Sequence, residues 1–142
     1  MYINQKVMEK YKIEKDIKLF YVQAESFPLG VGGAFKRLNE LIGDNKTRLL
    51  YGISFPDGAG SLVYRAAVEE TSAGEAEKAG CPIFIVRKGD YTSAYLRDWK
   101  KDESIIGRTF QELLRDPHID KQGYCLEIYP NEKDVQCLIP LE

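Results

Sequence analysis

The stretch TRLLYGISFPDGAGSLVYRAAVEE (residues 47–70) holds two runs rich in aromatic and branched side chains, separated by the turn-forming cluster PDGAG. Runs of this kind on either side of Pro, Asp and Gly residues are typical of a β-hairpin. The pattern predicts strands over 48–55 and 61–70, with the turn at residues 56–60. This hairpin decides the fold, because a similar arrangement occurs again later in the chain.

A strand and a helix are predicted ahead of this hairpin. The segment IKLFYVQAE predicts a strand over 17–25, and apolar residues spaced by three or four predict a helix over 30–42. The second half of the chain repeats this order, with strands predicted over 82–97, 123–130 and 134–140 and a helix over 104–115. Residues 1–12 are polar and rich in Lys and Glu, which favours a short helical start.

The order strand–helix–strand–strand therefore occurs twice, and matching residues such as Tyr21 and Tyr95 lie 74 positions apart. Consecutive hairpins with one helix per unit predict an α+β fold, in which an antiparallel sheet carries helices on one side. We expect pseudo-twofold symmetry between the repeats, with a ligand cleft between them. We expect a single domain over residues 1–142, with repeat one at about 13–70, a connector at 71–81 and repeat two at about 82–140.

The composition is that of an ordinary globular domain. Among 142 residues, 44% are hydrophobic and 30% charged, and 20 basic against 22 acidic residues give a net charge of −2. This charge provides no attraction to nucleic acid or to an acidic membrane. No apolar run is long enough to span a membrane, and the N-terminus lacks the apolar segment of a secretory signal.

Few residues carry reactive chemistry. The three cysteines, Cys81, Cys125 and Cys137, lie too far apart for a CxxC site, which argues against a disulfide framework or a structural zinc and favours a reduced, cytoplasmic protein. The one histidine, His118, follows Pro117 in a predicted loop, so we expect no catalytic triad around it. We therefore expect no metal and no cofactor, and we assign no catalytic residue.

The strand CLEIY, which starts at Cys125, carries a carboxylate beside an aromatic ring. Side chains alternate between the two faces of a strand, so Leu126 and Ile128 share one face, which we expect to pack on the helices. Cys125, Glu127 and Tyr129 then share the opposite, helix-free face. On an open sheet Glu127 is an ordinary surface residue. In a cleft it is a half-buried anion beside aromatic rings, which suits an organic cation through charge pairing and cation–π contact.

Other aromatic residues are candidates for the walls of such a cleft. Tyr91 and Tyr95 share a face of the strand predicted over 82–97, and Trp99 precedes the second helix. Tyr51 lies on the strand that matches the strand of Glu127 in the first repeat. For each of them the alternative is packing in the core or hairpin propensity. Tyr51 lies on the apolar face of its strand, yet the alignment of the two repeats places it opposite the strand face of Glu127. It can therefore face either the cleft or the helix-packed core.

Short motifs, taken in their order and spacing, give the chain a resemblance to a known family. They are SFP before the first helix (Ser26–Pro28), YGI after it (Tyr51–Ile53), Gly89-x-Tyr91, Glu127-x-Tyr129 and the closing Ile139-Pro140. The sequence resembles the gyrase-inhibitor-like (GyrI-like) small-molecule-binding family, which also forms the effector-binding domain of multidrug-responsive AraC- and MerR-type transcription regulators. The resemblance covers roughly residues 13–142 and implies two strand–helix–strand–strand modules around a ligand cleft.

The resemblance also implies a ligand and a site. The family's cleft glutamate, which meets cationic drugs, matches Glu127, followed by Tyr129, and its aromatic walls match Tyr91, Tyr95, Trp99 and Tyr51. The implied ligand is a small, largely apolar, cationic aromatic molecule. The regulators carry a helix-turn-helix domain ahead of this module, whereas about a dozen residues precede it here. We therefore expect a stand-alone module that does not bind nucleic acid directly.

Three functions are open at this point. The first is sequestration or sensing of such molecules. The second, which the resemblance implies, is hydrolysis of strained, cyclopropane-bearing electrophiles with Glu127 as base and Tyr91 or Tyr95 as donor. The third is a protein-interaction module such as a gyrase modulator, because a namesake of the family acts on DNA gyrase. A homodimer is also left open, since an open sheet edge can pair with another strand.

Overall fold

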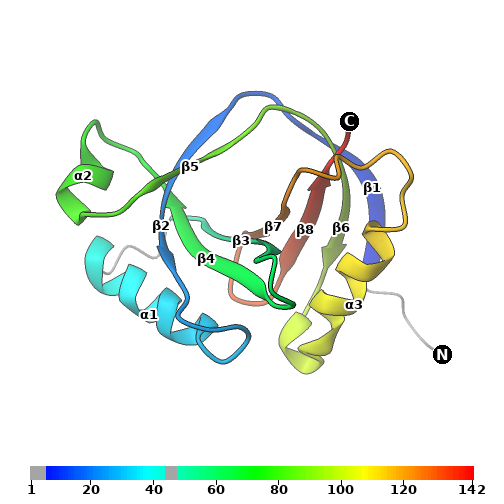
Figure 1. The fold of residues 1–142 in the computed structure, drawn as a ribbon, viewed down its shortest axis with the longest axis horizontal. Coiled ribbons are helices and arrows are strands. Elements are labelled where there is room, and N and C mark those ends of the chain that lie inside the picture. The colour runs from blue at the N-terminus through cyan, green and yellow to red at the C-terminus, as the bar shows by residue number, and fades with distance from the viewer. Residues whose placement is uncertain (1–5, 44–47) are drawn as a thin grey trace.

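The computed structural model describes residues 6–43 and 48–142. Its strands are β1 (Lys6–Ile13), β2 (Ile17–Gln23), β3 (Leu50–Pro56), β4 (Leu62–Glu69), β5 (Ile83–Val86), β6 (Gly89–Leu96), β7 (Cys125–Tyr129) and β8 (Val135–Pro140). Its helices are α1 (Val31–Ile42), α2 (Glu75–Ala79) and α3 (Ser104–Leu113), with a short 3-10 turn, η1 (Trp99–Lys101), ahead of α3. Figure 1 shows the strands as one strongly curled sheet.

The sheet is antiparallel and symmetric about its centre. Its strand order is β1-β6-β8-β7-β3-β4-β2-β5, so β7 and β3 form the central pair. Outward from that pair lie β8 and β4, then β6 and β2, and then β1 and β5 at the two edges. The strand–helix–strand–strand repeat and its pseudo-twofold arrangement are therefore confirmed, and the two repeats meet where β7 pairs with β3.

Most of the predicted elements are present within a few residues of their expected bounds, and the prediction of a short helical start in residues 1–12 was wrong for the part that the structure describes. Residues 6–13 form a strand, β1, because they pair along their whole length with β6. The strand predicted over 82–97 is two strands, β5 and β6, which part at Arg87 and Lys88 before Gly89, whose φ is +139°. The connector contains the short helix α2, whose Glu75 carboxylate accepts a hydrogen bond of 2.9 Å from Arg48.

The two long helices cover separate parts of one face of the sheet. Helix α1 packs on β2 and β4 through a core that includes Phe20, Leu38 and Val68. Helix α3 packs on β6 and β8 through Leu113, Val135 and other apolar residues. Figure 1 shows α1 and α3 apart from one another, each beneath its own half of the sheet. The central strands β3 and β7 lie between these two helix-packed regions.

The helix-free face carries the third core, and this finding overturns a prediction. Leu126 packs there with Tyr51, Ile53 and Leu138, and Ile128 joins the same cluster. The expectation that Leu126 and Ile128 face the helices was therefore wrong, and Cys125, Glu127 and Tyr129 lie on the helix-bearing face. Residues 74 positions apart in β3 and β7 point to opposite faces, so the two repeats are offset by one residue after their helices. A one-residue shift moves every side chain of a strand to the other face.

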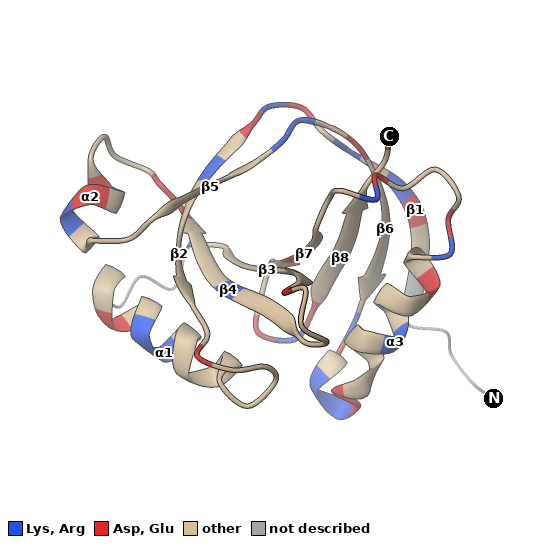
Figure 2. Cartoon of the chain, in the orientation of Figure 1, with Lys and Arg blue, Asp and Glu red and all other residues tan. Residues whose placement is uncertain are grey.

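The charges are mixed over the surface. Figure 2 shows that α1, α2 and α3 each carry both basic and acidic residues. The described helices therefore form no basic stripe of the kind that follows a phosphate backbone. Among the same residues, no helix is both long enough and apolar enough to cross a membrane.

Candidate functional site

Glu127 lies at the centre of the sheet, on the helix-bearing face. Its backbone partner in β3 is Gly52, which contributes no side chain, so an open position lies directly beside the carboxylate. The Tyr64 ring on β4 reaches across this position, and its hydroxyl donates a hydrogen bond of 2.8 Å to Glu127 Oε1. A Cβ on Gly52 would overlap the Tyr64 hydroxyl and lie 2.7 Å from Glu127 Oε1. Glycine at residue 52 is thus what lets these two side chains meet.

A second tyrosine completes the hydrogen bonding of this oxygen. The Tyr129 hydroxyl also donates to Glu127 Oε1, from two positions along the same strand. Residues at i and i+2 of a strand share a face, which brings Tyr129 to the carboxylate without any long-range pairing. Glu127 is only 6% exposed. The carboxylate accepts hydrogen bonds from two tyrosine hydroxyls. It forms no ion pair with any Lys or Arg that the structure describes.

Aromatic rings from both repeats pack against the two tyrosines that donate to this carboxylate. Phe27 stacks on Tyr64 with ring centroids 6.0 Å apart, and Phe35 of α1 packs edge-on against Tyr64 and Tyr129 at 6.1 and 6.0 Å. Trp99, in η1 before α3, belongs to the second repeat like Tyr129 and packs on that ring, with the two centroids 5.8 Å apart. We call Phe27, Phe35, Tyr64, Trp99 and Tyr129 the aromatic cluster. Phe27 is its most open member, at 38% exposed, whereas Tyr64 is 3% exposed.

The environment opposes negative charge on Glu127. Burial raises the pKa of this carboxyl, and the hydrogen bonds from Tyr129 and Tyr64 work in the opposite direction by stabilising the carboxylate. Burial together with the neighbouring Glu127 raises the pKa of both tyrosine hydroxyls, so both keep their protons and act as donors. The same two causes raise the pKa of the Cys125 thiol to about 11. The site therefore holds one acidic group, two neutral donors and an unreactive thiol.

The structure brings together three of the six residues expected to bind a ligand. Glu127, Tyr129 and Trp99 share the site on the helix-bearing face. Tyr91 is buried on the other face, where its hydroxyl lies 2.6 Å from that of Tyr124. Tyr51 belongs to the same helix-free core, and burial raises its pKa to about 12.

Tyr95 also lies apart from the aromatic cluster. It shares the strand face of Tyr91, and its hydroxyl donates a hydrogen bond of 2.8 Å to Asp134. Tyr91, Tyr95 and Tyr51 therefore make no contact with Glu127.

Four residues of the site were missed by the sequence prediction, namely Phe27, Phe35, Gly52 and Tyr64. Gly52 carried a usable signal, because glycine inside a strand often marks a place where another group approaches closely. Tyr64 alternates with Ala66 and Val68, which the α1 core buries, so its face could be recognised once the helix side was known. Phe35 gave no separate signal, because it is part of the apolar stripe of its helix.

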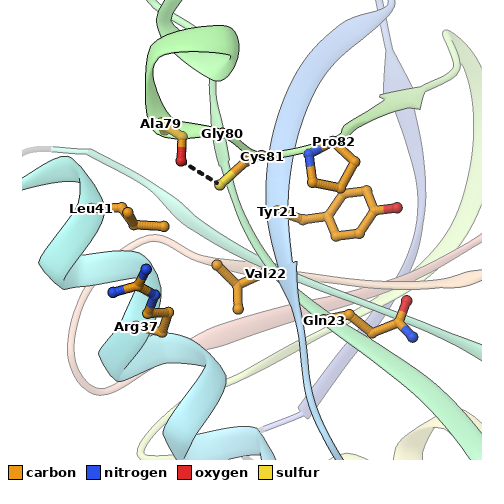
Figure 3. A pocket seen from close by; sticks show the side chains of 9 residues that line it. All are labelled: Tyr21, Val22, Gln23, Arg37, Leu41, Ala79, Gly80, Cys81 and Pro82. Atoms are coloured by element: carbon orange, nitrogen blue, oxygen red, sulfur yellow. Dashed lines mark hydrogen bonds between the residues drawn. The ribbon is translucent and has the colours of Figure 1, made fainter.

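A separate pocket of about 390 Å³ lies at the edge of the first repeat. Figure 3 shows it between α1 and the segment that joins α2 to β5, with Arg37 on one side and Cys81 on the other. Burial raises the pKa of the Cys81 thiol, and Arg37 opposes this only in part. The thiol donates weakly to the Ala79 carbonyl at 3.7 Å. This pocket offers no activated nucleophile and does not include Glu127, so the candidate site remains at the centre of the sheet.

Comparisons with known proteins support the fold. No family model matches the sequence, and no curated protein matches it. Several solved structures share the fold, and three of them are compared with this chain. An integron cassette protein from the mobile metagenome of Vibrio cholerae superposes with a TM-score of 0.65 at 15% identity, covering 95% of each chain.

The other two are similar at lower identity. SAV2435, solved bound to tetraphenylphosphonium, has a TM-score of 0.63 at 12% identity over 96% of this chain and 94% of its own. A Staphylococcus aureus MU50 protein provisionally described as a bacterial transcription regulation protein has a TM-score of 0.57 at 12% identity, covering 96% and 98%. At these identities the likeness establishes a shared fold.

Proposed function

We propose that this protein binds small, largely apolar organic cations in the aromatic cluster, with Glu127 supplying the negative charge. The observation that carries the proposal is a carboxylate 6% exposed, in no ion pair with any described Lys or Arg, and hydrogen-bonded to two tyrosines of the aromatic cluster. A buried anion without a cationic partner is costly, and a bound cation offsets that cost. Aromatic faces attract the same ligand through their quadrupoles.

The solved neighbours support this choice of ligand. SAV2435 was solved bound to tetraphenylphosphonium, a cation that consists almost entirely of aromatic surface. That ligand fits the chemistry of Glu127 and the aromatic cluster, and it gives a defined probe for the protein described here. Sequestration and sensing both begin with such binding, so the binding step is the one to test.

Titration of tetraphenylphosphonium by calorimetry tests the proposal. We expect saturable binding at one site, and we expect Glu127→Gln to weaken it by about 1–3 kcal/mol, roughly 5- to 150-fold, since a desolvated charge partner is lost. Neutral triphenylphosphine oxide should respond much less to the substitution. Glu77→Gln, the same change at an exposed residue of α2, is the matched control and should leave both affinities unchanged. Equal binding of the cation by wild type and Glu127→Gln contradicts the proposal.

A hydrolase is the second candidate, and one observation favours it. Glu127 accepts hydrogen bonds from two tyrosine hydroxyls, so a general base and two proton donors lie together. In such a hydrolysis Glu127 would accept a proton from the attacking water. Tyr64 or Tyr129 would donate a proton to the substrate, in place of Tyr91 or Tyr95, which the sequence had suggested as donors. Incubation with a cyclopropane-bearing electrophile separates the two functions. Catalytic turnover that is lost in Glu127→Gln supports the enzyme, and saturation without product supports the binding module.

A further inference from the structure

Phe27 is the most exposed member of the aromatic cluster. It is 38% exposed, whereas Tyr64, on which it stacks with ring centroids 6.0 Å apart and planes at 26°, is 3% exposed. A phenylalanine ring has no polar atom that hydrogen-bonds to water, so covering its exposed carbon surface with another apolar group is favourable. Phe27 is therefore packed over one part of its surface and available to a ligand over the rest.

The loop that carries Phe27 is held by its own backbone. The Gly30 N–H donates a hydrogen bond of 3.1 Å to the Ser26 carbonyl. The Val31 N–H donates one of 3.2 Å to the Pro28 carbonyl. A Cβ on Gly30 would lie 2.7 Å from both the nitrogen and the oxygen of the Ser26 backbone, so this close approach requires glycine. A ring on a loop fixed in this way loses little freedom when a ligand packs on it.

Tyr64 links Phe27 to the carboxylate. The Tyr64 ring contacts Phe27, and its hydroxyl donates a hydrogen bond of 2.8 Å to Glu127 Oε1. A cation that carries several rings can therefore place its charge near Glu127 and one ring on Phe27. Glu127 attracts an organic cation whatever the chemistry of its body. Phe27 distinguishes such bodies, because an aromatic pair is worth roughly 2- to 12-fold in affinity beyond the apolar area that it buries.

We propose, on the basis of the function proposed above, that Phe27 determines specificity by selecting cations with aromatic rings over aliphatic cations of the same charge. Both kinds of ligand gain from the charge of Glu127 and from burial of apolar surface. Only an aromatic ligand adds the offset-stacked or edge-on contact with the Phe27 ring. The preferred ligand class is therefore the aromatic cation, and Phe27 is the residue that makes it so.

The affinity for tetraphenylphosphonium divided by that for tetrabutylphosphonium measures this selectivity. The two cations carry the same charge, and only the first has rings. In Phe27→Leu, which keeps an apolar side chain but removes the ring, we expect the affinity ratio to fall about 2- to 12-fold. Phe27→Tyr keeps a ring and should keep the ratio. Phe84→Leu makes the matched change on the helix-free face, where Phe84 packs on Tyr124, and should also keep it.

Each outcome separates this inference from the proposed function. An unchanged ratio in Phe27→Leu overturns the inference, and so does an equal fall in Phe84→Leu or in Phe27→Tyr. Partial unfolding of a variant lowers both affinities alike and cancels in the ratio. If Glu127→Gln weakens binding while Phe27→Leu leaves the ratio unchanged, the proposed function stands and this inference fails. Absence of binding of both cations to the wild type refutes both.

Discussion

Gly52→Ala is expected to abolish tight cation binding and to destabilise the fold by about 1–3 kcal/mol, the usual cost of forcing an extra group into a packed site. The new Cβ would overlap the Tyr64 hydroxyl and stand 2.7 Å from Glu127 Oε1. Both side chains must turn away, which breaks their 2.8 Å hydrogen bond and moves the carboxylate out of the aromatic cluster. We expect the affinity for tetraphenylphosphonium to fall at least about tenfold, since the charge pairing is lost.

Urea unfolding and calorimetric titration measure these two effects, and Gly107→Ala provides the control. Gly107 lies inside α3, and a Cβ there meets nothing within 4 Å. Alanine in a helix interior is more favourable than glycine by about 0.5–1 kcal/mol, so the control should be slightly stabilised and should bind the cation as wild type does. Wild-type stability and affinity in Gly52→Ala would mean that residue 52 does not limit the approach of Tyr64 to Glu127.

Glu127 is expected to make the stability of the free protein fall as pH rises, and Glu127→Gln should remove this effect. Burial raises the pKa of Glu127 above its unfolded value of 4.5, so within the interval between the two values the folded state binds more protons than the unfolded state. Stability decreases with pH wherever that is true, by about 1.4 kcal/mol for each unit between the two pKa values. The contribution is complete below the unfolded pKa and is lost as pH rises through the folded pKa.

Other carboxylates act in the opposite sense, so the difference between two proteins is the quantity to measure. The pKa of Glu75 is lowered by its hydrogen bond from Arg48, and that of Asp134 is lowered by Tyr95 and Asn131 against the effect of burial. These groups stabilise the fold above their unfolded pKa. The free energy of unfolding is measured in urea for wild type and for Glu127→Gln from about pH 4 to pH 8. The contributions of the other carboxylates cancel in the difference between the two proteins, and Glu77→Gln is again the control. If the difference in unfolding free energy stays constant across this pH range, the pKa of Glu127 is the same in the folded and the unfolded protein.

A bound cation should reverse the behaviour of Glu127. Positive charge beside the carboxylate favours its ionised form, so the affinity for tetraphenylphosphonium should rise as pH increases through the pKa of Glu127. Calorimetric titrations over the same pH range measure this directly. An affinity that does not change with pH would show that the cation binds away from the carboxylate.

The sequence by itself determined the elements whose signals are local. The stripes of α1 and α3, the hairpin of β3 and β4 and the repeated order of elements all follow from spacing within a few turns or strand residues. The pairing of Glu127 with Tyr129 is local too, since two residues on one strand separated by a single residue must share a face. A strand such as β1 was not visible, because its polar sequence forms an edge only when β6 is present to pair with it.

Only the tertiary structure decided which face of the sheet carries the candidate site. Alternation divides β7 into two sets of residues, but it does not say which set the helices approach, and the apolar pair Leu126 and Ile128 packs in the core of the helix-free face instead. Gly52 and Tyr64 come to Glu127 through the pairing of β3 with β7 and β4, and Phe35 comes to Tyr129 through the packing of α1. These contacts join residues far apart in the chain, and their geometry depends on the register of every strand between them. Local preferences set the period of each segment, whereas long-range packing sets its face and its neighbours.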